Sequence, residues 1–222
     1  MIDAQKARAE ILARIRSATA TPRSKSAVES WQAIPREYRQ HGVLDHANCI
    51  ALLEDRLLEF GAGVRRSTRQ HISSEIAVIL RHKNRHQILV PAEIDRSWLP
   101  QGFPFVTDCN LSYGELDACN GVLTGCSIAI ALTGTIVLCH GMALSPTQAA
   151  GRRALTLVPD YHLRVVETSS VVETVPQAFQ ALDAYRQQPI TLISGPSATA
   201  DIEMTRIQGV HGPRVLDVLL VG

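Results

Sequence analysis

Hydroxyl and carboxylate side chains gather near the end of the chain, directly after a short apolar run. They are Ser194, Ser197, Thr199, Asp201 and Glu203. Gly195 and Pro196 predict a turn, and the small side chains around them let backbone N–H groups approach an anion closely. Open α/β sheets bind ligands in such loops at the carboxyl ends of their strands. A structural role fits equally well, because Ser197 or Thr199 is a suitable N-cap for a helix.

A histidine follows in a glycine-rich loop. His211 directly precedes Gly212 and lies shortly before a predicted final strand at residues 215–221. Imidazole exchanges a proton near neutral pH, so His211 is a candidate general acid or base, or the partner of an anion. Asp201, Glu203 and His211 are therefore the candidate catalytic residues. A structural hydrogen-bonding role for His211 fits the pattern as well.

Two further groups could join these loops. Thr133-Gly134-Thr135 separates two apolar runs, and its hydroxyl and amide groups are expected to face the same pocket, unless it is a plain hairpin turn. The forked donors of Arg152 suit a carboxylate or phosphate, although the residue also fits a solvated position at a loop end. We predict a small carboxylate or phosphate ligand bound by Thr133, Gly134, Thr135, Arg152, Ser194, Gly195, Ser197, Thr199, His211 and Gly212.

The elements that position these residues follow from the spacing of apolar side chains and from turn signals. Helices are predicted at residues 3–18, 45–60, 74–83, 112–120 and 175–185. Strands are predicted at residues 63–66, 87–90, 122–124, 127–132, 135–139, 163–166, 190–193 and 215–221. The alternation of helices with short apolar strands indicates βα units, and hence an α/β fold with a mainly parallel sheet.

The chain is expected to have two parts. Residues 1–30 should form an N-terminal helix and a flexible linker that covers residues 19–30, and residues 31–222 should form one domain. The N-terminal helix could bind a partner, exchange within a dimer or pack on its own domain. The loop of residues 141–151 has few apolar anchors and is expected to be mobile, as a lid would be.

Composition excludes several classes of protein. The 22 basic and 21 acidic residues leave a net charge of +1, which argues against broad binding to nucleic acid or membranes. The apolar run at residues 128–139 is too short for a membrane span, and early charges argue against a signal peptide, so we expect a cytoplasmic protein. The cysteines form no C-x-x-C pair, so we expect no metal or iron–sulfur cluster in this chain. They are Cys49, Cys109, Cys119, Cys126 and Cys139.

The polar motifs together resemble those of a known family. Ser-Gly-Pro-Ser-x-Thr-x-Asp-Ile-Glu at residues 194–203 and Gly-Val-His-Gly-Pro at residues 209–213 resemble the C-terminal signature of the LUD (lactate utilisation) domain family. Within this family the chain is similar to the small, stand-alone C-type members. The resemblance covers roughly residues 40–222. It implies an open, Rossmann-like, mainly parallel sheet with helices on both faces, like the NagB/RpiA/CoA-transferase fold.

The resemblance also implies a role in oxidising lactate to pyruvate beside iron–sulfur partner subunits, which alone would carry the clusters. Three functions are open: an accessory subunit that binds a small anion or a partner through the Thr133, Ser194 and His211 loops; a self-sufficient enzyme acting on a sugar phosphate, CoA ester or folate-like substrate; or a non-catalytic regulatory module. A homo-oligomer is compatible with each. Many relatives carry glutamate just before the Thr-Gly-Thr motif, where this chain has Leu132, so that carboxylate has no counterpart here.

Overall fold

The structure is a computed structural model that describes residues 4–19, 26–141, 145–200, 206–208 and 212–222. The chain divides into two compact units, residues 1–38 and residues 39–222. The sequence predicted this division after residue 30.

The described residues of the first unit form two helices, α1 (Ala4–Ala18) and α2 (Ala27–Gln32). Helix α1 confirms the predicted N-terminal helix. Helix α2 corrects the predicted linker, because its residues were expected to lack regular structure through residue 30. The reason is a capping box: the hydroxyl of Ser26 accepts from the N–H of Glu29, and the carboxylate of Glu29 accepts from the N–H of Ser26.

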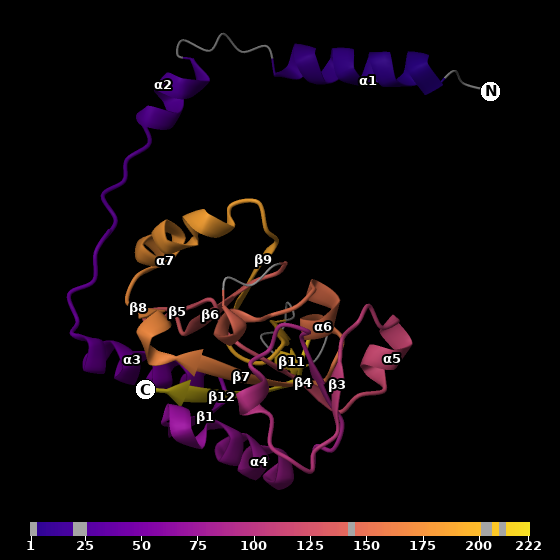
Figure 1. Cartoon of the computed structure of the whole chain (residues 1–222). Coiled ribbons are helices and arrows are strands. Elements are labelled where there is room, and N and C mark those ends of the chain that lie inside the picture. Colours follow the sequence, from indigo (N-terminus) through magenta and orange to yellow (C-terminus); the bar gives the residue numbers. More distant parts are fainter. Residues whose placement is uncertain (1–3, 20–25, 142–144, 201–205, 209–211) are drawn as a thin grey trace. The chain divides into compact units, whose positions relative to one another are not determined.

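A six-stranded sheet forms the centre of the second unit (Figure 1). Its strand order is β1-β12-β7-β4-β2-β3, and all neighbouring strands pair in parallel. The strands are β1 (Gly63–Ser67), β2 (Ile88–Val90), β3 (Phe105–Thr107), β4 (Gly121–Thr124), β7 (Tyr161–Glu167) and β12 (Val215–Val221). The mainly parallel α/β sheet predicted from the sequence is confirmed.

Helices cover both faces of this sheet, as predicted. Helix α4 (Ile72–His82) packs its buried isoleucines against β2, β7 and β12 on one face. On the other face lie α3 (His46–Glu59), α5 (Tyr113–Asp117) and α6 (Arg153–Leu157). The predicted caps of two of these helices are present, since the side chain of Asp45 accepts from Asn48 N–H and that of Ser112 from Glu115 N–H.

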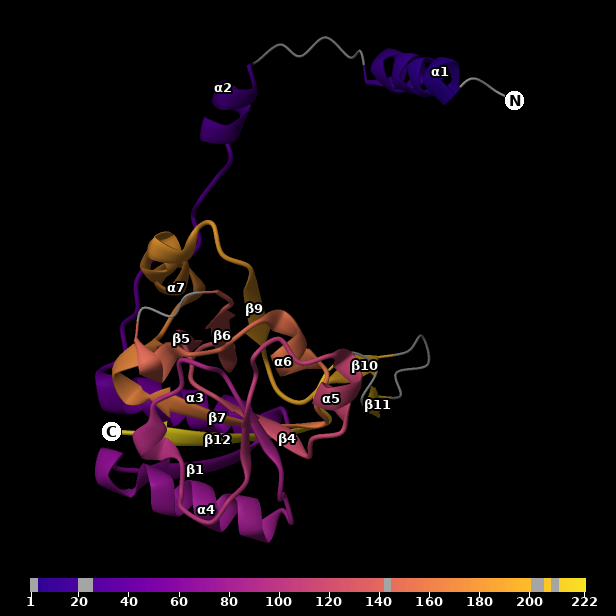
Figure 2. The same cartoon turned by 45° about the vertical axis from the view of Figure 1, so that its right-hand side comes forward.

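A second sheet covers part of the same face as α3. It has four strands in the order β8-β5-β6-β9, where β5 (Ile128–Ile130) and β6 (Thr135–Cys139) form the predicted hairpin. Strands β8 (Val171–Val172) and β9 (Ile190–Ile193) complete it. One face of this sheet shares a core with β12, and the other packs against α7 (Val175–Ala181). In Figures 1 and 2, α4 and α7 therefore lie at opposite sides of the unit with the two sheets between them.

A short antiparallel hairpin follows β9 and corrects one interpretation. Strand β10 (Ala198–Ala200) pairs with β11 (Arg206–Gln208). Ser197 therefore precedes a strand, and the interpretation of Ser197 or Thr199 as a helix N-cap was wrong. The physical reason is that β11 supplies partners for the backbone groups that a helix would have satisfied internally.

The loop of residues 141–151 also differs from expectation in the part that the structure describes. Residues 146–148 form a 3₁₀ turn, and Ala149 and Ala150 are buried. The N–H of Gly125 donates to the carbonyl of Ala149 over 2.9 Å. Residues 145–151 are therefore anchored on the core, and the prediction of a weakly anchored lid was wrong for them. Residues 142–144 lie outside the described residues.

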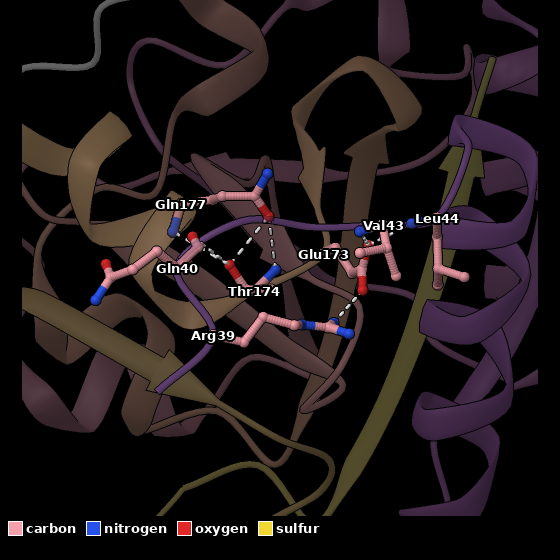
Figure 3. Close-up of polar contacts among 7 residues, drawn as sticks. All are labelled: Arg39, Gln40, Val43, Leu44, Glu173, Thr174 and Gln177. Carbon is pink, nitrogen blue, oxygen red and sulfur yellow. Dashed lines mark hydrogen bonds and ion pairs between the residues drawn. The ribbon is translucent and has the colours of Figure 1, made fainter. Parts of the chain in front are cut away.

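A buried carboxylate anchors the start of the second unit (Figure 3). Glu173, which follows β8, accepts hydrogen bonds from the guanidinium of Arg39 and from the N–H groups of Val43 and Leu44. Its side chain is 4% exposed. Gly42 fits beside it only because it lacks a side chain, since a Cβ there would lie 2.5 Å from Glu173 Oε2. Thr174 Oγ1 also donates to the carbonyl of Gln40 over 3.3 Å, so two neighbouring side chains hold segment 39–44 in place.

Candidate functional site

A cavity with a volume of about 300 Å³ borders the loop that follows β9. Three residues predicted for the ligand site contribute to its wall: Ser194, Gly195 and Ser197. Two residues of β7 that the sequence analysis did not select, His162 and Arg164, also line it. The cavity therefore joins the predicted polar loop to charged and polar groups inside the sheet.

The position of this cavity in the fold corrects an expectation. The predicted loop was placed at the carboxyl edge of the parallel sheet, where α/β proteins bind ligands. Strand β9 belongs instead to the four-stranded sheet, antiparallel to β6. The parallel strands reach the cavity through the amino-terminal parts of β7 and β12, at His162, Arg164 and Leu216. The cause is the second sheet, whose pairing the local pattern did not specify.

The structure brings the hydroxyl groups of two predicted loops together. Thr135 Oγ1 lies 2.7 Å from Ser194 Oγ and 2.8 Å from Thr133 Oγ1. The antiparallel pairing of Ile136 with Ile193 places the Thr135 and Ser194 hydroxyls at the same end of the β6–β9 ladder. Residues from segments far apart in the sequence thus form one hydroxyl cluster beside the cavity.

Glycine is required in both loops because they pack on the end of α3. Gly195 has φ +92°, and a Cβ there would lie 2.7 Å from Phe60 Cβ. Gly134 has φ +58°, and its Cβ would lie 2.7 Å from Arg56 Cβ. Both the positive φ and the close approach exclude larger side chains without strain. These glycines position the hydroxyl cluster, and Gly195 also lines the cavity.

The remaining residues of the predicted C-terminal loops are described only in part. The N–H of Ser197 donates to the carbonyl of Pro213 over 2.8 Å, and a Cβ on Gly212 would lie 3.8 Å from Ser197 Cβ. The backbone of Thr199 belongs to β10. The three candidate catalytic residues, Asp201, Glu203 and His211, lie outside the described residues.

Buried polar side chains form a network behind the cavity. Arg164 Nη2 donates to His162 Nδ1 over 3.1 Å, because a guanidinium can only donate. The proton of the neutral His162 ring is therefore on Nε2, which donates to Thr124 Oγ1 over 2.8 Å. Burial and the positive charge of Arg164 hold the pKa of His162 well below its usual range. His162 is thus neutral at physiological pH.

A second buried histidine reaches the same cavity through a threonine. His140 Nδ1 donates to the carbonyl of Gly151 over 2.9 Å, so Nε2 accepts from Thr191 Oγ1 over 2.8 Å. Burial lowers the pKa of His140. Thr191 lines the cavity, and because its proton points to His140, its oxygen lone pairs are left to accept other hydrogen bonds.

Arg164 is the charged member of this network. It is fully buried, and its Nε and Nη1 atoms have no hydrogen-bond partner among the residues that the structure describes. Burial lowers the pKa of Arg164 to about 9, so the guanidinium stays charged at neutral pH. The apolar pattern of its segment predicted only a strand. The signal that could have identified it was a histidine and an arginine, two residues apart, on one face of that strand.

Arg152, which was predicted to clamp a ligand, lines a different cavity, together with Gly151 and Asp108. Its Nε donates to Asp108 Oδ2 over 2.7 Å, its Nη2 donates to Asp108 Oδ1 over 3.0 Å, and Nη2 also donates to the carbonyl of Leu111. Burial raises the pKa of Asp108, but the hydrogen bonds from Arg152 and Leu111 outweigh it and lower the pKa overall. The charge of Arg152 is therefore compensated within the protein.

In the part of the chain that the structure describes, no three histidine, cysteine, aspartate or glutamate side chains are grouped as metal ligands would be. Among the described helices, none has the length and apolar character needed to span a bilayer. The predicted absence of a cofactor stays a prediction.

Comparisons with known proteins agree with the family resemblance of the motifs at residues 194–203 and 209–213. Residues 49–221 match the family model described as the LUD domain. The chain is 40% identical over 194 residues to Lactate utilization protein C of Deinococcus radiodurans, covering 86% of this chain and 87% of that protein. It is 31% identical over 142 residues to Lactate utilization protein C of Bacillus subtilis, covering 58% and 55% of the two chains.

A solved structure has the same fold. The crystal structure of a DUF162 family protein from Deinococcus radiodurans superposes with a TM-score of 0.68 at 36% sequence identity. The match covers 81% of this chain and all of that chain.

Proposed function

Because the chain belongs to the LUD domain family, we propose that it takes part in lactate utilisation as an accessory component rather than as a complete enzyme. The observation that carries this proposal is the 40% identity, over 86% of the chain, to a protein named Lactate utilization protein C. Its role would be in the oxidation of lactate to pyruvate, together with iron–sulfur partner subunits that hold the electron carriers.

The distribution of cysteines supports the accessory role. Oxidation of lactate to pyruvate removes two electrons, which need an acceptor. The sequence has no C-x-x-C pair and no Gly-x-Gly-x-x-Gly motif after a strand, the patterns typical of cluster and dinucleotide sites. The acceptor would therefore be held by a partner, and this chain would bind and present a small anion or form a docking surface.

The loops at Thr133, Ser194 and His211 are the proposed binding surface. The contact between Thr135 Oγ1 and Ser194 Oγ and the cavity beside residues 194–197 support this assignment for two of the three loops. The inclusion of His211 rests on the sequence motif alone. We also propose that the protein is cytoplasmic. The proposed function is compatible with a homo-oligomer.

The test is growth on lactate. Deleting the gene from its host should abolish growth on lactate but not on glucose, and the wild-type gene should restore it. Complementation with Ser197→Ala combined with Thr199→Ala should restore growth poorly, whereas Ser74→Ala, on the exposed side of α4, should restore it fully. Thermal melts of the purified variants show whether any loss exceeds a loss of stability.

Two outcomes would refute the proposal. Unchanged growth of the deletion strain on lactate would show that the protein has no role in lactate utilisation. Rapid lactate-dependent dye reduction by the purified chain alone would show that it is a complete enzyme.

A further inference from the structure

Arg164 carries a positive charge that the described protein does not compensate. It is fully buried on the face of β7 toward the second sheet, and no carboxylate of a described residue forms an ion pair with it. Two of its three nitrogens have no acceptor there. Proteins rarely leave a buried charge unpaired, because its lost hydration is not replaced. A group from outside the described residues would complete this site.

The titratable groups around Arg164 do not supply the missing negative charge. His162 accepts from its Nη2, and burial lowers the pKa of both His162 and His140, so both rings are neutral. Burial raises the pKa of the Cys126 thiol to about 12, so this neighbour is protonated. The site therefore has one net positive charge from the described residues that surround it.

The cavity next to Arg164 has the size and lining of a site for a small molecule. Its volume of about 300 Å³ is at the lower end of the range for ligand pockets. Its lining residues include Thr191 and Ser194, which carry hydroxyls, and the apolar Leu157 and Leu216. A ligand there would meet one cation, hydroxyl groups and a small apolar surface.

We propose that this cavity binds a small monocarboxylate, with the carboxylate on the guanidinium of Arg164. A single cation in low-dielectric surroundings matches a single negative charge, whereas a phosphate dianion would leave one charge uncompensated. The apolar wall accommodates a short carbon chain. Thr191 Oγ1, whose proton goes to His140, accepts a hydrogen bond from a hydroxyl next to the carboxylate. The ligand class is therefore a short monocarboxylate, and the contact with Thr191 favours a 2-hydroxy acid over its 2-keto counterpart, whose carbonyl oxygen can only accept.

This inference rests on the proposed function only for the choice of lactate and pyruvate as probes. Calorimetry on the full-length wild-type chain should detect binding of L-lactate or pyruvate. Lactamide, which has the shape of lactate without its charge, should bind at least about tenfold more weakly, and so should inorganic phosphate. Equal binding of lactamide would overturn the proposal, as would tighter binding of phosphate than of either carboxylate. These wild-type measurements decide the question without any variant.

Two variants locate the site. Arg164→Met should weaken lactate and pyruvate binding by about 10- to 100-fold, because a charged hydrogen-bond donor is lost. Arg186→Met removes an exposed arginine that pairs with Asp183 and should leave binding unchanged. If Arg164→Met does not fold, Arg164→Lys takes its place and should also weaken binding, because lysine lacks the forked donors. Unchanged binding in a folded Arg164 variant would overturn the assignment.

Stability without ligand gives an independent readout. A buried charge without an ionic partner costs free energy through its lost hydration, and an apolar side chain of similar length removes that cost. We therefore expect ligand-free Arg164→Met to melt at or above the wild-type temperature and to lose the stabilisation by lactate. A lower Tm together with retained carboxylate binding would assign Arg164 to the fold and contradict the proposal.

The two proposals fail in different ways. If the deletion strain cannot grow on lactate but the purified chain binds no monocarboxylate, the cavity inference fails and the proposed function stands. If the chain binds lactate or pyruvate through Arg164 while the deletion strain grows normally on lactate, the site stands and the proposed function fails.

Discussion

Charged side chains in this protein differ in how they are compensated. Glu173 is surrounded by donors from Arg39, Val43 and Leu44 and serves the fold. Arg152, at a loop end, is paired with a buried aspartate. Arg164 has an excess of unused donors and borders a cavity. This comparison separates the residue suited to bind a ligand from those that hold the chain together.

A pH-dependent stability is expected from Glu173. The N–H of Leu44 above all, then that of Val43 and the charge of Arg39, lower the pKa of Glu173 despite its burial. The folded state therefore binds the proton less readily than the unfolded state, in which glutamate titrates at about 4.3. The stabilisation is present above that pH and is lost as the pH falls through the lower folded-state pKa.

Glu173→Gln should remove this contribution. The variant should have a lower Tm than the wild type near neutral pH, and the difference should shrink when melts are recorded below about pH 4. Glu59→Gln, an exposed carboxylate in α3 that pairs with Arg56, should have little effect at any pH. A Tm difference for Glu173→Gln that does not change with pH would contradict this account.

Sequence reasoning selected hydroxyl groups of the site but missed its cation. The hydroxyls of Ser194, Ser197 and Thr135 stand out because turn signals surround them. Arg164 lies inside an apolar strand, and its burial depends on how a second sheet packs on β7. Such packing is set by contacts far apart in the chain, which a local pattern does not contain.

Among the elements, those with local signals were predicted well. Short-range spacing predicted the N-caps of α3 and α5 and the strand at residues 215–221, and the structure has all three at the predicted positions. The pairing of β10 with β11 and the separation of β9 from the parallel sheet were missed, because strand partners are chosen by tertiary contacts. Helix α2 had a local signal, its capping box, that the linker composition obscured.

The turn after β9 requires glycine at residue 195. Gly195→Ala would combine a positive φ with contact against Phe60, and we expect it to lower the free energy of unfolding by about 2 kcal/mol. Gly114→Ala is the matched control, because a Cβ there meets nothing within 4 Å and the residue lies in helix α5. It should be neutral or stabilise by up to about 1 kcal/mol. Urea unfolding of both variants measures the difference, and equal effects would show that the turn tolerates a side chain.

For the whole molecule, the division into two units predicts where the chain can be shortened. A chain that starts at Arg39 retains the whole second unit and every donor to Glu173, so its Tm should stay within a few degrees of the full-length value. A chain that starts at Asp45 lacks Arg39, Val43 and Leu44 and leaves the Glu173 carboxylate without these partners. It should melt at a clearly lower temperature. Equal melting temperatures for the two shortened chains would show that segment 39–44 is dispensable.

The place of β12 in the parallel sheet affects how the protein can form during translation. Strand β12 lies between β1 and β7, although it comes from residues 215–221 and β1 from residues 63–67. Strands β2, β3, β4 and β7 can pair as they leave the ribosome, but β1 has no neighbour until residues 215–221 have been made. Until then β1 and the facing edge of β7 are open, and open strand edges pair readily with other chains. A nascent chain that stalls before Val215 therefore exposes two strand edges to aggregation.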